Sequence, residues 1–185
     1  MKVASLLFLA SFVAASPTVY FIRHGEKPEE GNGLNAQGQQ RAQCLRSVFG
    51  ETSQYNIGYI MAQTYKAGAF LGDLSDMRKA NPSDGSRKRP YDTVLPLAQD
   101  LGLEVDTSCD RDDGDCVKDV VKGYTGSGNI LICWEHKRLN NLAEALGADD
   151  VDNYPSDRFD IIWTDPPKYK EITAETSEDC PGLDA

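Results

Sequence analysis

Short apolar runs alternate along the chain with longer stretches in which apolar residues recur three or four positions apart. β-Branched and aromatic residues dominate the runs, which is typical of buried strands, whereas the longer spacing is typical of helices that bury one face. The runs lie at 19–22, 57–62, 103–105, 129–134 and 159–163. Strands that alternate with helices predict one α/β domain with a mostly parallel central sheet. The tail from Thr164 lacks both patterns, and we expect it to be irregular.

Capping residues set the expected limits of two helices. Asn35 is a suitable N-cap for a helix that Gly50 ends. A second helix opens at Arg89, has proline in its first turn, and ends before Gly102. Pro96 lies inside this second helix, so we expect either a kink or a break near Leu95. Two further helices are expected around 117–121 and 139–146.

The amino terminus has the pattern of an export signal. Residues 1–16 combine a basic Lys2, an apolar run and small residues before Pro17. This order is typical of a secretory signal peptide, and the run is shorter than the roughly 20 residues that a membrane-spanning helix needs. We therefore expect the mature chain, 17–185, to be a single secreted, extracellular domain without a membrane anchor.

The net charge of −10 limits the partners of the protein. A surface with this excess of acidic groups repels polyanions, so we expect neither nucleic acid nor an anionic membrane as a partner. A small anion could still bind where a few arginine and histidine side chains converge. The sequence does not indicate an oligomeric state.

Five cysteines in an exported chain predict disulfides with one thiol left over. Cys109 and Cys116 bracket a tight acidic loop, and this short separation predicts a local bridge. Cys44 and Cys180 are the second predicted pair. Cys133 then stays free, because it lies inside a buried apolar strand. With two histidines and no Cys-x-x-Cys pair, the chain offers no zinc site.

Polar side chains follow directly after two of the predicted strands. Arg23-His24-Gly25-Glu26 follows the first strand, and Glu135-His136 follows the strand at 129–134. The carboxyl ends of parallel strands form the edge at which open α/β sheets bind ligands. The helix that opens at Arg89 brings a further positive charge to this edge.

These features resemble the histidine phosphatase superfamily, the phosphoglycerate mutase-like group. The resemblance rests on the Arg23-His24-Gly25 triplet, the stretch Leu34 to Ala42, the spacing from Arg89 to Thr93, and His136 at a strand end. It implies a three-layer α/β/α fold and a phosphatase that uses neither metal nor cofactor. It also implies a small phosphorylated substrate.

The resemblance assigns a role to each candidate. His24 is the nucleophile that forms a phosphohistidine, and Arg23, Arg89 and His136 bind the phosphate together with it. A carboxylate must protonate the leaving alcohol, and Glu135 is the candidate we name. The open alternatives are Glu26, Asp110, Asp112 and Asp113. Arg87 and Lys88 belong to a basic run that we interpret as a solvated patch.

One departure keeps a second function open. Lys137 stands where acid phosphatases of this superfamily often have aspartate after the second histidine. A protein that binds phosphate with little or no catalysis is therefore the alternative to an enzyme. A mutase is a third alternative, disfavoured because its substrates and its phosphorylated priming cofactor are scarce outside the cell.

A long stretch, about 65–82, separates Arg89 from the strand at 57–62 by more than the resemblance implies. Its apolar residues keep no regular period. It is either a tolerated surface insertion or sequence translated from an intron that was wrongly kept in the gene model.

Overall fold

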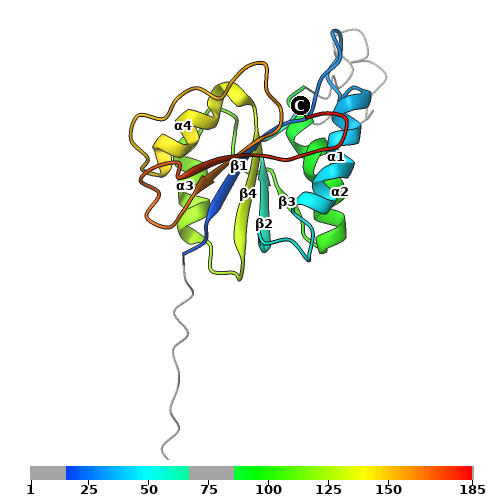
Figure 1. Cartoon of the computed structure of the whole chain (residues 1–185). Coiled ribbons are helices and arrows are strands. Elements are labelled where there is room, and N and C mark those ends of the chain that lie inside the picture. Colours follow the sequence, from blue (N-terminus) through cyan, green and yellow to red (C-terminus); the bar gives the residue numbers. More distant parts are fainter. Residues whose placement is uncertain (1–15, 67–85, 185) are drawn as a thin grey trace, which may run out of the picture.

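The structure is a computed structural model that describes residues 16–66 and 86–184. Six strands form one sheet in the order β3-β2-β4-β1-β5-β6 (Figure 1). Neighbours among β3, β2, β4 and β1 are parallel, whereas β5 and β6 pair in the antiparallel direction. The strands are β1 (Val19–Arg23), β2 (Ile57–Ala62), β3 (Val105–Asp106), β4 (Asn129–Trp134), β5 (Ile161–Asp165) and β6 (Ala174–Ser177).

Two helices cover each face of the sheet (Figure 1). One face carries α1 (Ala36–Val48) and α2 (Arg89–Leu101), and the other carries α3 (Gly114–Gly123) and α4 (His136–Leu146). Because side chains alternate along a strand, β1 sends Phe21 into the core under α3 and α4 and Ile22 into the core under α1 and α2. The predicted α/β fold, with three layers and a mostly parallel sheet, is confirmed.

Local sequence signals explain where the first two helices begin and end. The Asn35 side chain accepts a hydrogen bond of 2.9 Å from the Gly38 N–H and so caps α1. Gly102 ends α2 with φ of 64°, a left-handed conformation that glycine adopts without steric cost. The break considered near Leu95 does not occur, and α2 runs through Pro96. Val94 and Leu97 on either side of Pro96 are fully buried, so their packing holds the helix together.

The largest error of the sequence interpretation lies in the tail. It was expected to be irregular, but Ala174 to Ser177 form β6, paired with β5 so that Glu175 lies opposite Trp163. This strand has no buried residue and therefore no alternating apolar signal. The strand expected at 159–163 is likewise displaced, because β5 begins only at Ile161.

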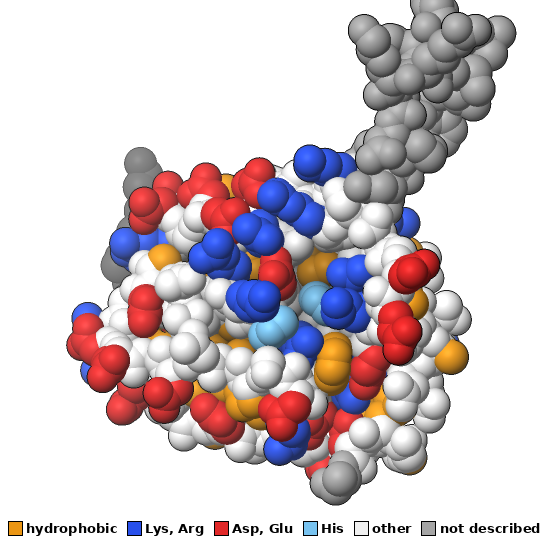
Figure 2. All heavy atoms as spheres, turned by 90° about the horizontal axis from the view of Figure 1, so that it is seen from above, with side chains coloured by type: hydrophobic (Ala, Val, Ile, Leu, Met, Phe, Trp, Pro, Cys, Tyr) orange, Lys and Arg blue, Asp and Glu red, His pale blue; other side chains and the backbone are white. Residues whose placement is uncertain are grey.

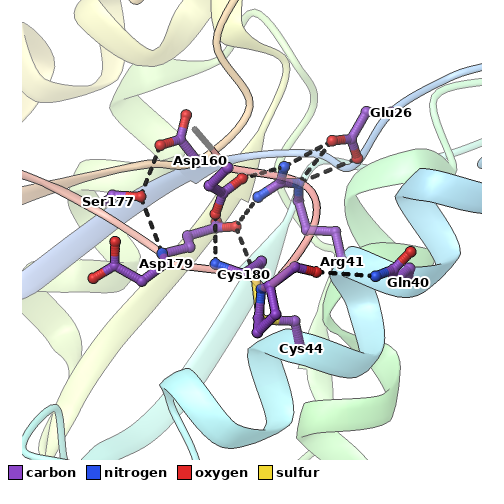
Figure 3. Close-up of a disulfide and its surroundings, with 11 residues drawn as sticks. Glu26, Gln40, Arg41, Cys44, Asp160, Ser177, Asp179 and Cys180 are labelled. Atoms are coloured by element: carbon purple, nitrogen blue, oxygen red, sulfur yellow. Dashed lines mark hydrogen bonds and ion pairs between the residues drawn. A yellow bond between two sulfur atoms is a disulfide. The ribbon is translucent and has the colours of Figure 1, made fainter.

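The predicted cysteine pairing is confirmed. Cys109 is bonded to Cys116, Cys44 to Cys180, and Cys133 is a free, buried thiol. The second bridge ties the carboxyl-terminal tail to α1 (Figure 3).

Two predictions concern segments largely outside the described residues. The predicted signal peptide is one, and most of the stretch expected at 65–82 is the other. On either side of that second gap, the Lys66 N–H donates a 3.1 Å hydrogen bond to the Ser86 carbonyl, so the chain leaves and returns at neighbouring points. Within 16–66 and 86–184, none of the helices has the length and apolar character needed to cross a membrane.

We predict that the two disulfides differ in their contribution to stability. A crosslink restricts the unfolded chain more when the loop it closes is longer, and the separations are 136 residues for Cys44–Cys180 and 7 for Cys109–Cys116. Chain entropy gives roughly 5 kcal/mol for the first and roughly 2 to 3 kcal/mol for the second. Urea unfolding of Cys44→Ala/Cys180→Ala and of Cys109→Ala/Cys116→Ala measures both. Equal losses would contradict the assignment of the effect to loop length.

Asp165, at the end of β5, is a buried acidic residue without a hydrogen-bond or ion-pair partner among the described residues. Its side chain is fully buried, and neither carboxylate oxygen has a hydrogen-bond partner. Burial raises the pKa of Asp165 to about 7. The folded protein therefore holds this proton more tightly than the unfolded chain does, and stability falls as pH rises from about 4 towards 7.

We predict that Asp165→Asn stabilises the protein at pH 8 by about 2 to 3 kcal/mol, with a much smaller gain at pH 4.5. The reason is that only the charged carboxylate carries the cost of burial. Urea unfolding at the two pH values provides the measurement, and the exposed Asp119→Asn is the matched control. A gain that is the same at both pH values would refute the proposed ionisation.

Candidate functional site

The parallel pairing of β1 with β4 brings the two predicted histidines to one edge of the sheet. Arg23 lies opposite Trp134 at the end of the ladder, and the His24 N–H continues it with a 3.1 Å hydrogen bond to the Trp134 carbonyl. His136 begins α4 only two residues after Trp134. The chain therefore leaves both strands side by side, each with a histidine.

All five predicted site residues line one pocket of about 200 Å³ at this edge. Figure 2 looks onto the edge and shows both histidines close together, ringed mainly by lysine and arginine. The predicted residues are Arg23, His24, Arg89, Glu135 and His136. The remaining lining residues are Lys27, Gln63, Arg87, Pro90 and Lys137.

His24 is held as a neutral ring with one nitrogen available. Its side chain is only 6% exposed, and Nδ1 lies 2.7 Å from the Gly25 carbonyl oxygen. A carbonyl can only accept, so Nδ1 carries the proton and Nε2 has a free lone pair. Burial, together with the positive charges of Arg23 and Arg89, lowers the pKa of His24 to about 4, against the opposing hydrogen bond to Gly25.

The turn after His24 is fixed from α1 and α2. The Gly25 N–H donates a 2.9 Å hydrogen bond to Thr93 Oγ1, and this hydroxyl donates a 2.7 Å bond to the Arg89 carbonyl. Gly38 packs so closely that a Cβ there would lie 2.3 Å from the Glu26 carbonyl oxygen. Glycine is therefore required at position 38, since any side chain would displace the turn.

Arg23 and Arg89 are anchored by backbone carbonyls rather than by carboxylates. Arg23 Nη1 donates to the carbonyls of Ser156 and Arg158 at 2.8 and 2.7 Å, and its guanidinium carbon lies 3.6 Å from the centre of the Phe159 ring. Arg89 Nε and Nη2 donate to the carbonyls of Gly33 and Gly31 at 3.1 and 2.7 Å. Burial lowers the pKa of both arginines, yet each guanidinium remains charged. Among the described residues, no carboxylate lies within ion-pair distance of either guanidinium, so both can act on an anion.

His136 and the N-termini of two helices add further features that favour negative charge at the pocket. Burial, together with the positive charge of Arg23, lowers the pKa of His136 to about 4. Its Nδ1 is buried and has no hydrogen-bond partner. It lies at the start of α4, as Arg89 lies at the start of α2, and neither helix has a side-chain cap. Uncapped helix N-termini favour negative charge.

Glu135 is the one carboxylate on the pocket wall among the residues that the structure describes. Its Oε2 accepts a 3.0 Å hydrogen bond from Arg111 Nη1. Its backbone N–H donates to Gln63 Oε1 at 3.2 Å. The Trp134 ring nitrogen donates to the Arg111 carbonyl at 2.9 Å and so fixes the backbone of the loop that supplies Arg111. Both ends of the Glu135 residue are thereby held.

The other acidic candidates are engaged elsewhere. Glu26 accepts from Arg41 Nη2 at 2.7 Å, and this arginine, 1% exposed, also binds Glu178 at 2.6 Å and Asp184 at 2.8 Å (Figure 3). Asp110 pairs with Arg87, Asp112 pairs with Arg111 and Arg138, and Asp113 caps α3. None of the four lines the pocket.

Sequence reasoning missed several lining residues. Arg87, interpreted as part of a solvated patch, lies on the pocket wall. Gln63 is the residue after β2, so the strand-end rule that found the histidines could also have found it. Lys27 and Lys137 carried no signal beyond their closeness in sequence to the two histidines.

Of the described residues, one grouping has the geometry to hold a metal ion, namely Glu178, Cys180 and Asp184. The two carboxylates already bind Arg41, and the sulfur belongs to a disulfide. These groups are therefore committed to other partners.

No family model matches the chain, and neither does any curated protein. Among solved structures, the chain is similar to SixA from Agrobacterium tumefaciens, which is assigned as a phosphohistidine phosphatase. The match covers 88% of this chain and 99% of SixA, with a TM-score of 0.48 and 11% sequence identity. We infer no activity from this likeness.

Proposed function

We propose that the protein is a secreted, metal-independent phosphatase that acts on a small phosphorylated substrate through a phosphohistidine. The observation that carries the proposal is a buried neutral histidine beside two guanidinium groups without acidic partners. Such a combination supports attack on an anion, because the nucleophile needs a free lone pair while the phosphoryl oxygens need positive charge. The two disulfides support export into an oxidising environment.

The reaction assigns a step to each group. His24 Nε2 attacks phosphorus, a P–N bond forms, and the bond to the leaving oxygen breaks. Arg23, Arg89 and His136 hold the phosphoryl oxygens, whose positioning and charge stabilisation supply most of the catalysis. Water then attacks phosphorus, the P–N bond breaks, and phosphate and free His24 are released.

Glu135 is the group that we assign to proton transfer. It lines the pocket beside His136. From this position, Glu135 donates a proton to the leaving oxygen in the first step and takes a proton from the attacking water in the second. Its ion pair with Arg111 fixes its direction but also occupies the carboxylate oxygen Oε2.

A protein that binds phosphate without catalysis is the second candidate. It is favoured because Glu135 is already paired with Arg111 and because Lys137 stands where an acidic residue often follows the second histidine. The two functions differ in one measurement: such a protein binds inorganic phosphate but releases none from an aryl phosphate at any pH. A mutase is a further candidate, and transfer of phosphate between two substrates would reveal it.

We predict that His24→Ala lowers phosphate release from an aryl phosphate by at least about three orders of magnitude, because the nucleophile is removed. His136→Ala is the matched control, since it removes a phosphate contact but leaves the nucleophile. Labelled substrate and a rapid denaturing quench should trap an acid-labile phosphoenzyme in the control but not in His24→Ala. Wild-type turnover in His24→Ala would exclude the phosphohistidine.

We predict that Glu135→Gln affects substrates according to their leaving group. An aryl phosphate needs little protonation and should react at close to the normal rate, whereas an alkyl phosphate should slow by roughly a hundredfold or more. Comparison of kcat for the two substrates tests this. Asp112→Asn, in the neighbouring loop but outside the pocket, should slow both substrates equally, if at all. An equal loss for both substrates in Glu135→Gln would assign Glu135 a structural role instead.

A further inference from the structure

The pocket carries more positive charge than one phosphoryl group can neutralise. Arg23 and Arg89 together match the two negative charges of a phosphate monoester. Lys27 and Lys137 also line the wall, and they are additional to that match. Glu135 does not offset them, because it is already paired with Arg111 at 3.0 Å.

Unlike Arg87 and Lys88, these two lysines have no acidic partner among the residues that the structure describes. Arg87 is paired with Asp110 at 2.7 Å, and Lys88 with Asp92 at 3.1 Å. Within the described parts of the chain, no carboxylate lies within ion-pair distance of Lys27 or Lys137. In a protein with a net charge of −10, two unpaired lysines on one pocket wall point to an anion that comes from outside.

Lys137 directly follows His136 in the chain, and both lysines line the same pocket as His136. Burial and the charge of Arg23 are the main causes that lower the pKa of His136, and the charges of Lys137 and Lys27 add to them. The arginine charges that lower the pKa of His24 are those of Arg23 and Arg89. The charges of Arg23 and Arg89 thus act on His24, and those of the two lysines act on His136. The pocket volume of about 200 Å³ is larger than the volume of a single phosphoryl group, so the pocket has room for a second group.

We propose that Lys27 and Lys137 form a second anion subsite, and that the substrate carries a second phosphate group next to the phosphoryl group that is cleaved. This inference rests on the proposed function, because the first phosphate must lie at His24. A second phosphate is preferred over a carboxylate because two lysine charges match a dianion. Diphosphates and compounds phosphorylated at two neighbouring positions have the required spacing.

Three phosphonates that cannot be hydrolysed test the subsite without turnover. Methylphosphonate has one phosphonate head, phosphonoacetate adds a carboxylate, and methylenediphosphonate adds a second phosphonate. Calorimetric Kd values for the full-length exported protein should show the diphosphonate binding roughly tenfold more tightly than methylphosphonate, since each exposed lysine contributes a modest, screened interaction. Phosphonoacetate should lie between them. High salt should reduce the preference.

The variant Lys27→Gln/Lys137→Gln should reduce the preference to about twofold or less, while the Kd for methylphosphonate changes by less than about threefold. Lys88→Gln is the matched control, because it removes the same charge next to Arg89 from a residue that does not line the pocket. It should retain the preference. Thermal unfolding of each variant verifies that it folds.

The outcomes separate the subsite from the proposed function. If methylphosphonate binds but the wild-type protein shows no preference for the diphosphonate, the subsite is excluded and the phosphate pocket stands. A preference that survives in the double variant, or that falls equally in Lys88→Gln, also excludes it. Tighter binding of phosphonoacetate than of the diphosphonate would overturn the assignment to phosphate. If none of the three binds, the phosphate pocket is excluded, and the subsite with it.

Discussion

The parallel pairing of β1 with β4 is the contact on which the site depends. It joins residues more than a hundred positions apart and directs both strands towards the same edge, so that His24 and His136 emerge side by side. Both strands lie inside the sheet, covered by helices on each face, and nearly all their side chains are buried. A site built at the ends of such strands is held rigidly while its loops remain free to vary.

Charge is separated within a small region of this acidic protein. Behind the turn at His24, Arg41 forms ion pairs with three carboxylates, and Arg111 forms one with Glu135. The acidic side chains nearest the pocket are therefore already paired. Arg23 and Arg89 instead donate hydrogen bonds to backbone carbonyls, which fix the orientation of each guanidinium without cancelling its charge. Carbonyl anchoring therefore orients a guanidinium while leaving it able to attract an anion.

The sequence was most informative where local chemistry and burial agree. The ends of β2 and β4, the Asn35 cap and the Cys109–Cys116 bridge could be predicted, because each depends on a residue type in a short pattern. β6 could not, because a strand without a buried face leaves no apolar period. The position of Lys27 and Lys137 on the pocket wall also could not be predicted, since it depends on how two loops pack after the strands have paired.

The edges of the sheet have a consequence for the behaviour of the protein at high concentration. β3 closes one edge with only two residues, and β6 closes the other with four residues, three of them exposed. Edge strands with unpaired backbone groups can template the growth of β-sheet aggregates, and short or polar edges suppress this. Neither edge offers a long apolar strand to another copy of the chain. The sheet thus ends in a way that disfavours fibril formation.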